Sequence, residues 1–141
     1  MWQQLGPGSR ACRPSSSAPA AAPATQAPAT PSLTAQVATW VAGSGYTEMK
    51  AVESDTTTTI GTDASNQDVS AVESDGSTLA TDAQAAALDP PPIDNAEYTA
   101  AMTYYATAGN DASNGDFTDA TTAMNNGTAL INKVAAAVTN S

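Results

Sequence analysis

The placement of proline divides this chain into a leader and two long tracts that are free to form helices. Six of the nine prolines lie within residues 1–31, and the other three are consecutive, from Pro90 to Pro92. Proline lacks a backbone N–H and clashes with the preceding helical turn, so helix interiors exclude it. Residues 32–89 and 93–141 contain none. The sequence therefore predicts two helical regions joined by a stiff, extended link.

Apolar residues in both tracts recur at helical spacing. The clearest stripe has alternating steps of three and four residues, a rhythm typical of helices that pack nearly parallel or antiparallel. Its members are Phe117, Ala120, Met124, Gly127, Ile131, Val134 and Val138. Similar stripes start at Val69 and at Tyr98, and a weaker one runs from Met49 to Ile60. This pattern predicts an all-α protein.

An eight-residue phrase occurs twice, as DASNQDVS at 63–70 and as DASNGDFT at 111–118. In the second copy, Gly115 is placed to take the left-handed conformation that ends a helix. Asp116 follows it, where its carboxylate can cap the next helix, and Asp68 holds the same position in the first copy. We expect each phrase to form a turn and a helix start. Replacing either aspartate by alanine should then cost about 1 kcal/mol of stability.

These features predict the domain organisation. Residues 1–32 are expected to form a disordered leader or tether rich in Pro, Ala, Ser and Thr, because they have little apolar surface to bury. Residues 33–141 are expected to form an up-down-up-down four-helix bundle made of two repeated helical hairpins. The first hairpin would span about 46–88, the Pro-rich joint 89–93, and the second hairpin about 94–139.

The charge of the chain excludes several classes of partner. All fourteen acidic residues lie at or beyond Glu48, and only Lys50 and Lys133 are basic after the leader. Residues 32–141 thus carry two positive and fourteen negative charges, a net of −12. Such a surface repels nucleic acid and anionic lipid, so we expect neither as a direct partner of the folded body. The absence of a run of about 18 apolar residues predicts that no helix is inserted in a membrane.

The chain lacks the residues of most catalytic and metal sites. It has no histidine, which is the commonest general base and metal ligand. A single cysteine, Cys12, can form neither an internal disulfide nor a cysteine-based zinc site. The Asp-rich turns do not follow a calcium loop, because counting Gly115 as the sixth residue puts Ala112 third and Thr121 twelfth, where glutamate is needed. We predict a non-enzymatic protein with no metal or cofactor.

Three aromatic residues are candidates for contact with a partner or ligand. Trp40 lies in a lead-in segment, 33–42, where it can either plug one end of the bundle or stack on a ligand. Tyr105 belongs to an apolar stripe, and Tyr104 beside it is expected to be half exposed. For both tyrosines, packing in the core or at its boundary is the alternative to a binding role.

The leader and the body also resemble known proteins. Cys12 precedes RPSSSAPAAAPATQAPATPS, and this arrangement resembles actinobacterial envelope lipoproteins and secreted proteins, in which such a spacer commonly follows a lipid-modified cysteine. Over about 36–138 the chain resembles an uncharacterised actinobacterial helical domain. That resemblance rests on the order of WVAGSG at 40–45, NQD at 66–68, DPPPID at 89–94 and NGD at 114–116. It implies no known enzyme activity, an extracellular or cell-envelope location, and a lipid anchor at Cys12.

We therefore expect a non-enzymatic exported or cell-envelope domain with a structural or protein-interaction role, whose partner is an envelope or extracellular protein. The first alternative is a small-ligand or lipid-binding carrier, with a cavity between Ala-rich helices near Trp40 and Tyr105. The second is an acidic cytosolic protein, because MWQQLGPGSRA before Cys12 lacks the apolar stretch of a lipoprotein signal.

Overall fold

The computed structural model describes residues 20–21 and 28–141, and Cys12 with most of the expected leader lies outside these residues. The described residues form helices joined by turns and contain no strand, which confirms the all-α prediction for this part of the chain. The elements are α1 (Leu33–Val41), α2 (Ser44–Ser54), the π-helical segment η1 (Asp55–Thr59), α3 (Ile60–Ser65), α4 (Val69–Ala86), α5 (Asn95–Ser113) and α6 (Phe117–Thr139).

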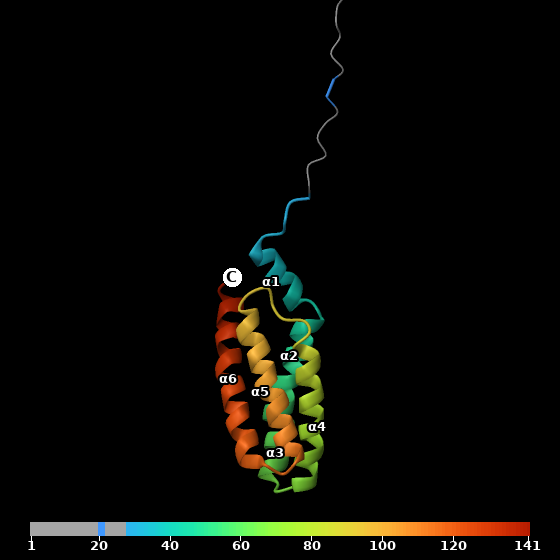
Figure 1. The fold of residues 1–141 in the computed structure, drawn as a ribbon, viewed down its shortest axis with the longest axis vertical. Helices are drawn as coiled ribbons and strands as arrows, with labels where there is room; N and C mark the ends of the chain where they lie inside the picture. Colours follow the sequence, from blue (N-terminus) through green and yellow to red (C-terminus); the bar gives the residue numbers. More distant parts are fainter. Residues whose placement is uncertain (1–19, 22–27) are drawn as a thin grey trace, which may run out of the picture.

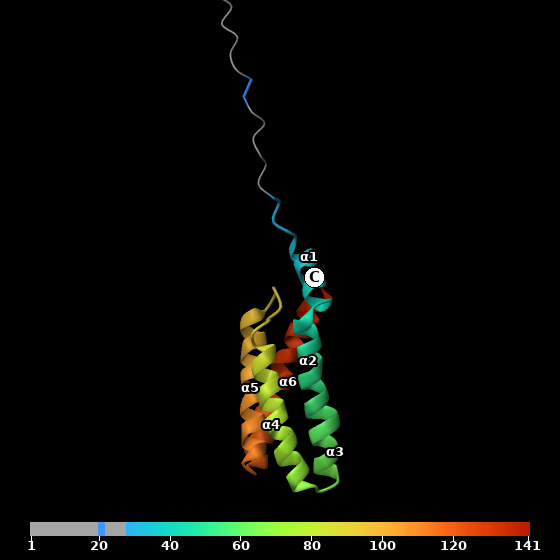
Figure 2. The ribbon, with the colours of Figure 1, turned by 90° about the vertical axis from the view of Figure 1, so that its right-hand side faces the viewer.

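The segment from α2 to α3 and the helices α4, α5 and α6 run along the long axis of the molecule, and the chain reverses direction between each of these and the next (Figures 1 and 2). Elements α2, η1 and α3 follow one another without a break, and we call residues 44–65 the first long helix. The end that carries α1, the Pro-rich joint and the C-terminus is called the upper end (Figure 1). The end that carries the turns at 66–68 and 114–116 is called the lower end.

The first copy of the repeated phrase ends α3 with a Schellman turn. The backbone N–H of Asp68 donates to the carbonyl of Asp63 at 3.0 Å, and that of Gln67 donates to the carbonyl of Ala64 at 3.2 Å. Gln67 has a φ of 59°, so a glutamine here takes the left-handed conformation usually left to glycine. Asp68 then caps α4, because its Oδ1 accepts the backbone N–H of Ala71 at 3.1 Å.

The second copy makes the same two backbone hydrogen bonds, from Asp116 to Asp111 at 2.8 Å and from Gly115 to Ala112 at 3.0 Å. Gly115 takes the left-handed conformation, with a φ of 80°. Asp116 occupies the N-cap position of α6, but its carboxylate makes no capping hydrogen bond, so the expected side-chain cap is absent there. Asp119 in the first turn of α6 already places a carboxylate at the positive end of the helix, whereas α4 has no acidic residue in its first turn.

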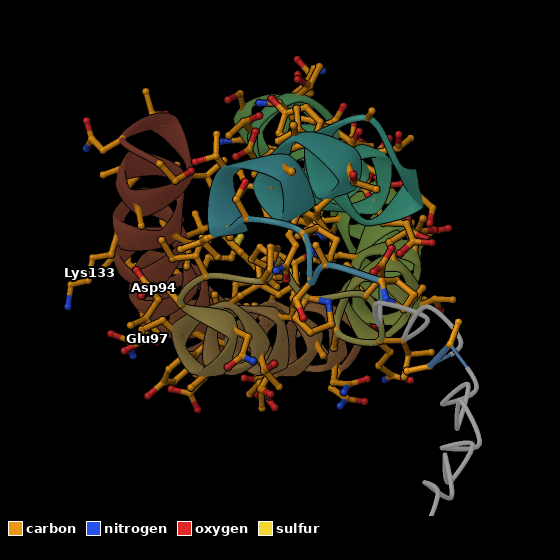
Figure 3. The ribbon with its side chains drawn as sticks, turned by 90° about the horizontal axis from the view of Figure 1, so that it is seen from above. Asp94, Glu97 and Lys133 are labelled. Carbon is orange, nitrogen blue, oxygen red and sulfur yellow. The ribbon has the colours of Figure 1, made fainter. Side chains whose placement is uncertain are left out.

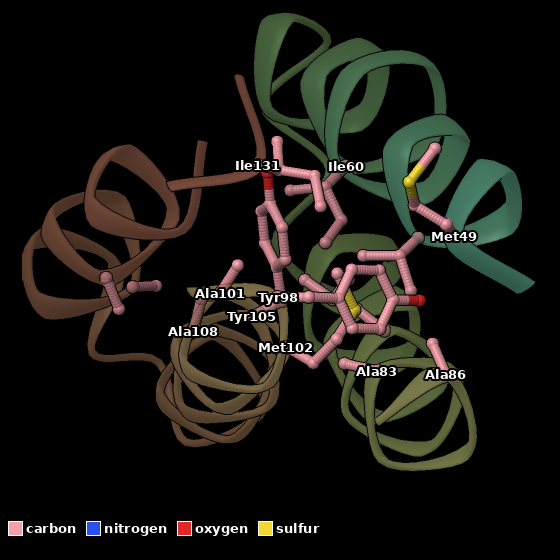
Figure 4. Close-up of a cluster of buried hydrophobic side chains, with 14 of the residues drawn as sticks. Met49, Ile60, Ala83, Ala86, Tyr98, Ala101, Met102, Tyr105, Ala108 and Ile131 are labelled. Atoms are coloured by element: carbon pink, nitrogen blue, oxygen red, sulfur yellow. The ribbon is translucent and has the colours of Figure 1, made fainter. Parts of the chain in front are cut away.

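The core is built from alanine and a few large side chains. Figure 4 shows side chains of α5 pointing toward the neighbouring helices, among them Tyr98, Met102 and Tyr105. Burying a large apolar side chain contributes about 2 kcal/mol, whereas alanine contributes much less. The largest fully buried side chains are Tyr98, Tyr105, Leu79, Met102, Val52, Val134 and Pro91. Stability in this molecule therefore depends on a small number of residues.

Two glycines allow α4 and α5 to approach closely. A Cβ atom on Gly76 would lie 2.7 Å from the carbonyl oxygen of Gly109, and a Cβ on Gly109 would overlap the carbonyl oxygen of Gly76. Beside them, the hydroxyls of Ser77 and Ser113 lie 3.1 Å apart. Any side chain at either glycine would separate the two helices.

At the upper end, Trp40 ties α1 to the Pro-rich joint. Its indole N–H donates to the carbonyl of Asp89 at 2.8 Å, and its ring packs edge-on against Tyr46 and Tyr98. A Cβ on Gly45 would collide with the indole nitrogen and would lie 2.5 Å from the Asp89 carbonyl oxygen. The glycine thus makes room for the tryptophan.

The first long helix contains a π-helical segment between two of its buried residues. Val52 precedes this segment and Ile60 follows it. In η1 the backbone N–H of Ile60 donates to the carbonyl of Asp55, five residues earlier, which adds one residue to the turn. Periodicity of 3.6 residues could not indicate this insertion.

Candidate functional site

The structure places the three predicted contact residues in different surroundings. Trp40 and Tyr105 are buried, and the hydroxyl of Tyr105 lies 3.1 Å from that of Thr128. Burial raises the pKa of Tyr105 above its ordinary value. Tyr104 is 40% exposed and lines a broad depression of about 640 Å³ between α5 and α6. Of the three, only Tyr104 presents a large part of its side chain to a partner.

An apolar groove lies at the lower end, between α3, the start of α4 and the first half of α6. We call it the lower groove; its volume is about 350 Å³. Its apolar lining includes Ile60, Ala64, Val69, Val72, Phe117 and Met124. Val69 is 51% exposed and Phe117 is 37% exposed, so large apolar side chains meet the solvent here.

The repeated phrase accounts for part of this groove. Val69 and Phe117 are the first residues of α4 and α6, and each directly follows the aspartate of its turn. Both helices start at the lower end (Figures 1 and 2), so the two equivalent apolar positions line the same groove. The sequence carried this signal, because an apolar residue follows the aspartate in both copies.

Helix packing leaves a hollow seam beside the first long helix. The close helix pairs are α4 with α5, α5 with α6, and α2 with α4, and no comparable contact joins the first long helix to α6. A second hollow of about 350 Å³ lies on the same side near the upper end, lined by Met49 of α2 and by Val134 and Val138 of α6. The first long helix is therefore held mainly on its α4 side.

Charge is unevenly distributed around the lower groove. Asp68 lines the groove, and Asp116 and Asp119 lie at the adjacent start of α6. The two lysines of the body lie elsewhere: Lys50 is bonded to Glu53 at 2.6 Å, and Lys133 lies near Asp94 and Glu97 in the view from the upper end (Figure 3). The lower groove is thus an apolar surface in an acidic neighbourhood.

Aspartates face one another across the contact between the first long helix and α4. Asp55 of η1 faces Asp82. The pKa of Asp55 is raised to about 6, first by burial, then by hydrogen bonding to Asp82 and by repulsion from Asp82 and Asp75. Asp63 of α3 faces Asp75. The pKa of Asp75 is raised, first by hydrogen bonding to Asp63, then by burial and by repulsion from Asp63 and Asp68. We call Asp55–Asp82 and Asp63–Asp75 the carboxyl pairs.

One oxygen of each carboxyl pair has no hydrogen-bond donor. Oδ2 of Asp55 and Oδ2 of Asp75 are buried and unpartnered within the described part of the chain. Two ionised carboxylates can only accept hydrogen bonds, so neither member of a pair can satisfy the other until one binds a proton. The arrangement favours uptake of a proton at each pair.

Sequence reasoning missed both carboxyl pairs. A signal was present, because Asp55 and Asp63 lie eight residues apart and Asp75 and Asp82 lie seven apart, spacings of about two helical turns. Those spacings place each set on one face of its helix. Recognising the pairing also required knowing that these two faces meet.

Within the described residues, no group of three or more Cys, Asp or Glu side chains is arranged to hold a metal ion. None of the helices in that part of the chain is long and apolar enough to cross a membrane. Comparison of the chain with protein-family models, with curated proteins and with solved structures finds no match.

Proposed function

We propose that residues 33–141 form a four-helix bundle of up-down-up-down order, made of two repeated helical hairpins. The matching hydrogen bonds of the two turns support the repeat. The alternating direction of the first long helix, α4, α5 and α6 supports the bundle (Figures 1 and 2). In this arrangement α1 covers the upper end.

On this scaffold, we propose a non-catalytic interaction domain that binds a basic, amphipathic segment of a partner protein in the lower groove. The observation that carries the proposal is the exposure of Val69 and Phe117, which line the same groove as Asp68 and lie near the acidic start of α6. Apolar grooves commonly receive the apolar face of a peptide helix. Partner residues such as leucine would fill the groove, and flanking lysines or arginines would face Asp68, Asp116 and Asp119.

The charge of the molecule supports a basic partner over an acidic or neutral one. Residues 32–141 carry a net charge of −12, so a cationic segment is attracted from a distance and an anionic one is repelled. Attraction of this kind weakens with added salt, whereas contact with Val69 and Phe117 does not. The two contributions can therefore be separated experimentally.

The test is titration of the full chain with a fluorescent amphipathic peptide made of leucine and lysine, followed by fluorescence anisotropy. Phe117→Ser and Val69→Ser should each weaken binding by about tenfold, the effect of losing about 1.4 kcal/mol of apolar contact. Leu88→Ser is the matched control, because Leu88 is 86% exposed and lies outside the groove. Equal weakening by all three changes, or equal binding of a leucine and glutamate peptide, would refute the proposal.

The volume of the groove supports a second candidate, a carrier of small apolar ligands. A cavity of about 350 Å³ lies at the lower end of the range for small-molecule sites. A neutral or cationic lipid-like molecule would suit this lining better than a fatty acid anion. A rise in melting temperature with a neutral monoglyceride, lost in Phe117→Ser, together with no peptide binding, would favour the carrier over the interaction domain.

We also propose that the domain is exported and held at the cell envelope through a lipid on Cys12. The uncharged Pro/Ala/Ser/Thr-rich spacer at 14–32 supports the proposal, since it suits a tether between an anchor and a folded body. The intact mass and N-terminus of the mature protein from fractionated cells test it. A diacylated Cys12 at the N-terminus is expected, and a cytosolic chain that retains Met1 would refute it.

A further inference from the structure

We propose that the two carboxyl pairs act as an acid-operated latch that holds the first long helix against α4. Each pair takes up one proton from solvent, and the protonated carboxyl then donates a hydrogen bond to its ionised partner across the helix contact. In mildly acidic solution the latch is closed. In neutral solution the facing carboxylates repel each other and the first long helix is held less firmly.

The register of the two helices supports the latch. The first long helix and α4 run in opposite directions, so the order Asp55 then Asp63 on one helix meets the order Asp82 then Asp75 on the other (Figure 2). The pairs therefore form two steps, about two helical turns apart, along a single contact. One step involves η1 and the other involves α3.

The unpartnered oxygens show what the latch lacks when it is ionised. Oδ2 of Asp55 and Oδ2 of Asp75 are both buried without a donor. A hydrogen bond between a carboxylic acid and a carboxylate is charge-assisted and strong, and one proton per pair supplies it. Protonation therefore removes a repulsion and satisfies a buried acceptor in the same step.

Among the described residues, no cation contributes to the pKa shifts of Asp55 and Asp75. The charged groups that face Asp55 are Asp82 and Asp75 of α4. Those that face Asp75 are Asp63 of α3 and Asp68 of the following turn. The basic residue of the first long helix is Lys50, and its ammonium group forms a salt bridge with Glu53.

The sign of the pH effect follows from the direction of the pKa shifts. The pKa of Asp55 rises from 3.8 to about 6 on folding, and that of Asp75 also rises, so the folded chain binds protons more tightly than the unfolded chain. The stabilisation is fully present below the ordinary aspartate pKa and is lost as the pH rises through about 6.

The latch affects how firmly the whole of the first long helix is held. The backbone of the first long helix approaches α4 more closely than it approaches α6, and the carboxyl pairs lie at this closest helix contact. Ile60 and Ala64 of this helix form one wall of the lower groove. The latch therefore also sets how firmly this wall is held, and the effect of this on binding rests on the proposed function. The latch itself requires no partner, and its tests use none.

The first test measures the melting temperature of the full chain by circular dichroism at about pH 5 and about pH 7.5. Both measurements are made in about 0.5 M salt, which screens the general repulsion of the acidic surface. The wild-type chain should melt at least about 4 °C higher at the lower pH. Equal melting temperatures would overturn the proposal.

A double variant, Asp63→Asn with Asp82→Asn, locates the effect. Each asparagine can donate an amide N–H to the aspartate opposite it, as the protonated acid would, at any pH. The variant should melt higher than wild type at about pH 7.5 and lose most of the pH dependence. Glu97→Gln, an exposed carboxylate on α5, is the matched control and should keep the wild-type response. A double variant that is less stable at neutral pH, or one that keeps the full pH response, would also overturn the latch.

Hydrogen exchange at a single pH of about 7.5 adds a local readout. Amides of η1 and α3 should exchange several-fold more slowly in the double variant than in wild type, while amides of α5 and α6 change little. A uniform change along the chain would contradict a latch confined to the first long helix. Loss of peptide binding in the groove assay with these results intact would reject the proposed function and leave the latch standing.

Discussion

The molecule contains two helical hairpins, one of α5 and α6 and the other of the first long helix and α4. Their turns have the same hydrogen-bond pattern, but the contacts between the two helices of each hairpin differ in chemistry. In the second hairpin Gly127 packs against the ring of Tyr105, and the Tyr105 hydroxyl meets that of Thr128. In the first, Asp55 faces Asp82 across the helix contact, one turn of the helix is π-helical, and a groove remains open toward α6. The same local phrase thus forms the same turn, while residues further along each helix decide how firmly the hairpin closes.

Equivalent positions in the two hairpins offer direct ways to test this difference. Residues 48 apart in the sequence occupy the same place relative to the turn, so one substitution can be made twice in two surroundings. Urea unfolding followed by circular dichroism measures each change in the free energy of unfolding.

Gly61 and Gly109 should respond to alanine with opposite signs. Gly109→Ala places a methyl group against the carbonyl of Gly76 and should destabilise the protein by about 3 kcal/mol through overpacking. At Gly61 the added Cβ would lie 3.7 Å from the carbonyl of Thr56, an ordinary contact. Gly61→Ala should therefore stabilise the helix by about 0.5–1 kcal/mol. Similar losses at both positions would show that Gly61 is packed against a neighbouring backbone as tightly as Gly109 is packed against α4.

The left-handed residue of each turn should show a smaller, reciprocal effect. Gly115→Ala should cost about 1 kcal/mol, because a Cβ atom is unfavourable at a φ of 80°. Gln67→Gly should stabilise the protein by up to about 1 kcal/mol, because it removes that strain from the first turn. A destabilising Gln67→Gly would mean that the glutamine side chain holds the turn in another way.

The smallest expected difference in the free energy of unfolding is between the two N-cap positions. Asp68→Ala removes a hydrogen bond to the Ala71 N–H and should cost about 1 kcal/mol. Asp116→Ala removes only a charge near the helix end and should cost about 0.3 kcal/mol. This departs from the equal losses expected from the sequence. Equal measured losses would indicate that the Asp116 carboxylate caps α6 in solution.

Much of the helical layout could be predicted from the sequence. The proline-free tracts contain every helix of the described residues, the turns before α4 and α6 lie within the repeated phrase, and both helices start at the residue after the aspartate. Boundaries moved by a few residues: α2 begins at Ser44 where about 46 was expected, and α4 ends at Ala86 where about 88 was expected. Helix ends depend on local packing, which explains shifts of this size.

The candidate site was much harder to predict. Trp40 and Tyr105 were singled out from the sequence as large aromatic residues, and both are buried in the structure. Val69 and Phe117 appeared in the sequence only as members of apolar stripes, and their exposure depends on how α3 and α6 diverge at the lower end. Helical periodicity identifies the apolar face of a helix without saying which part of that face remains uncovered.

The approximate positions of the helices follow from the amino-acid sequence, because proline, glycine and capping aspartate act on the backbone within a few residues. The acidity of the body and the left-handed turn at Gly115 also follow from it. Tertiary packing is what brings Asp55 to Asp82, places Gly109 rather than Gly61 against another backbone, and brings the first long helix closer to α4 than to α6. These are contacts between segments distant in the chain, and they depend on the relative rotation and separation of whole helices, which local backbone preferences do not set.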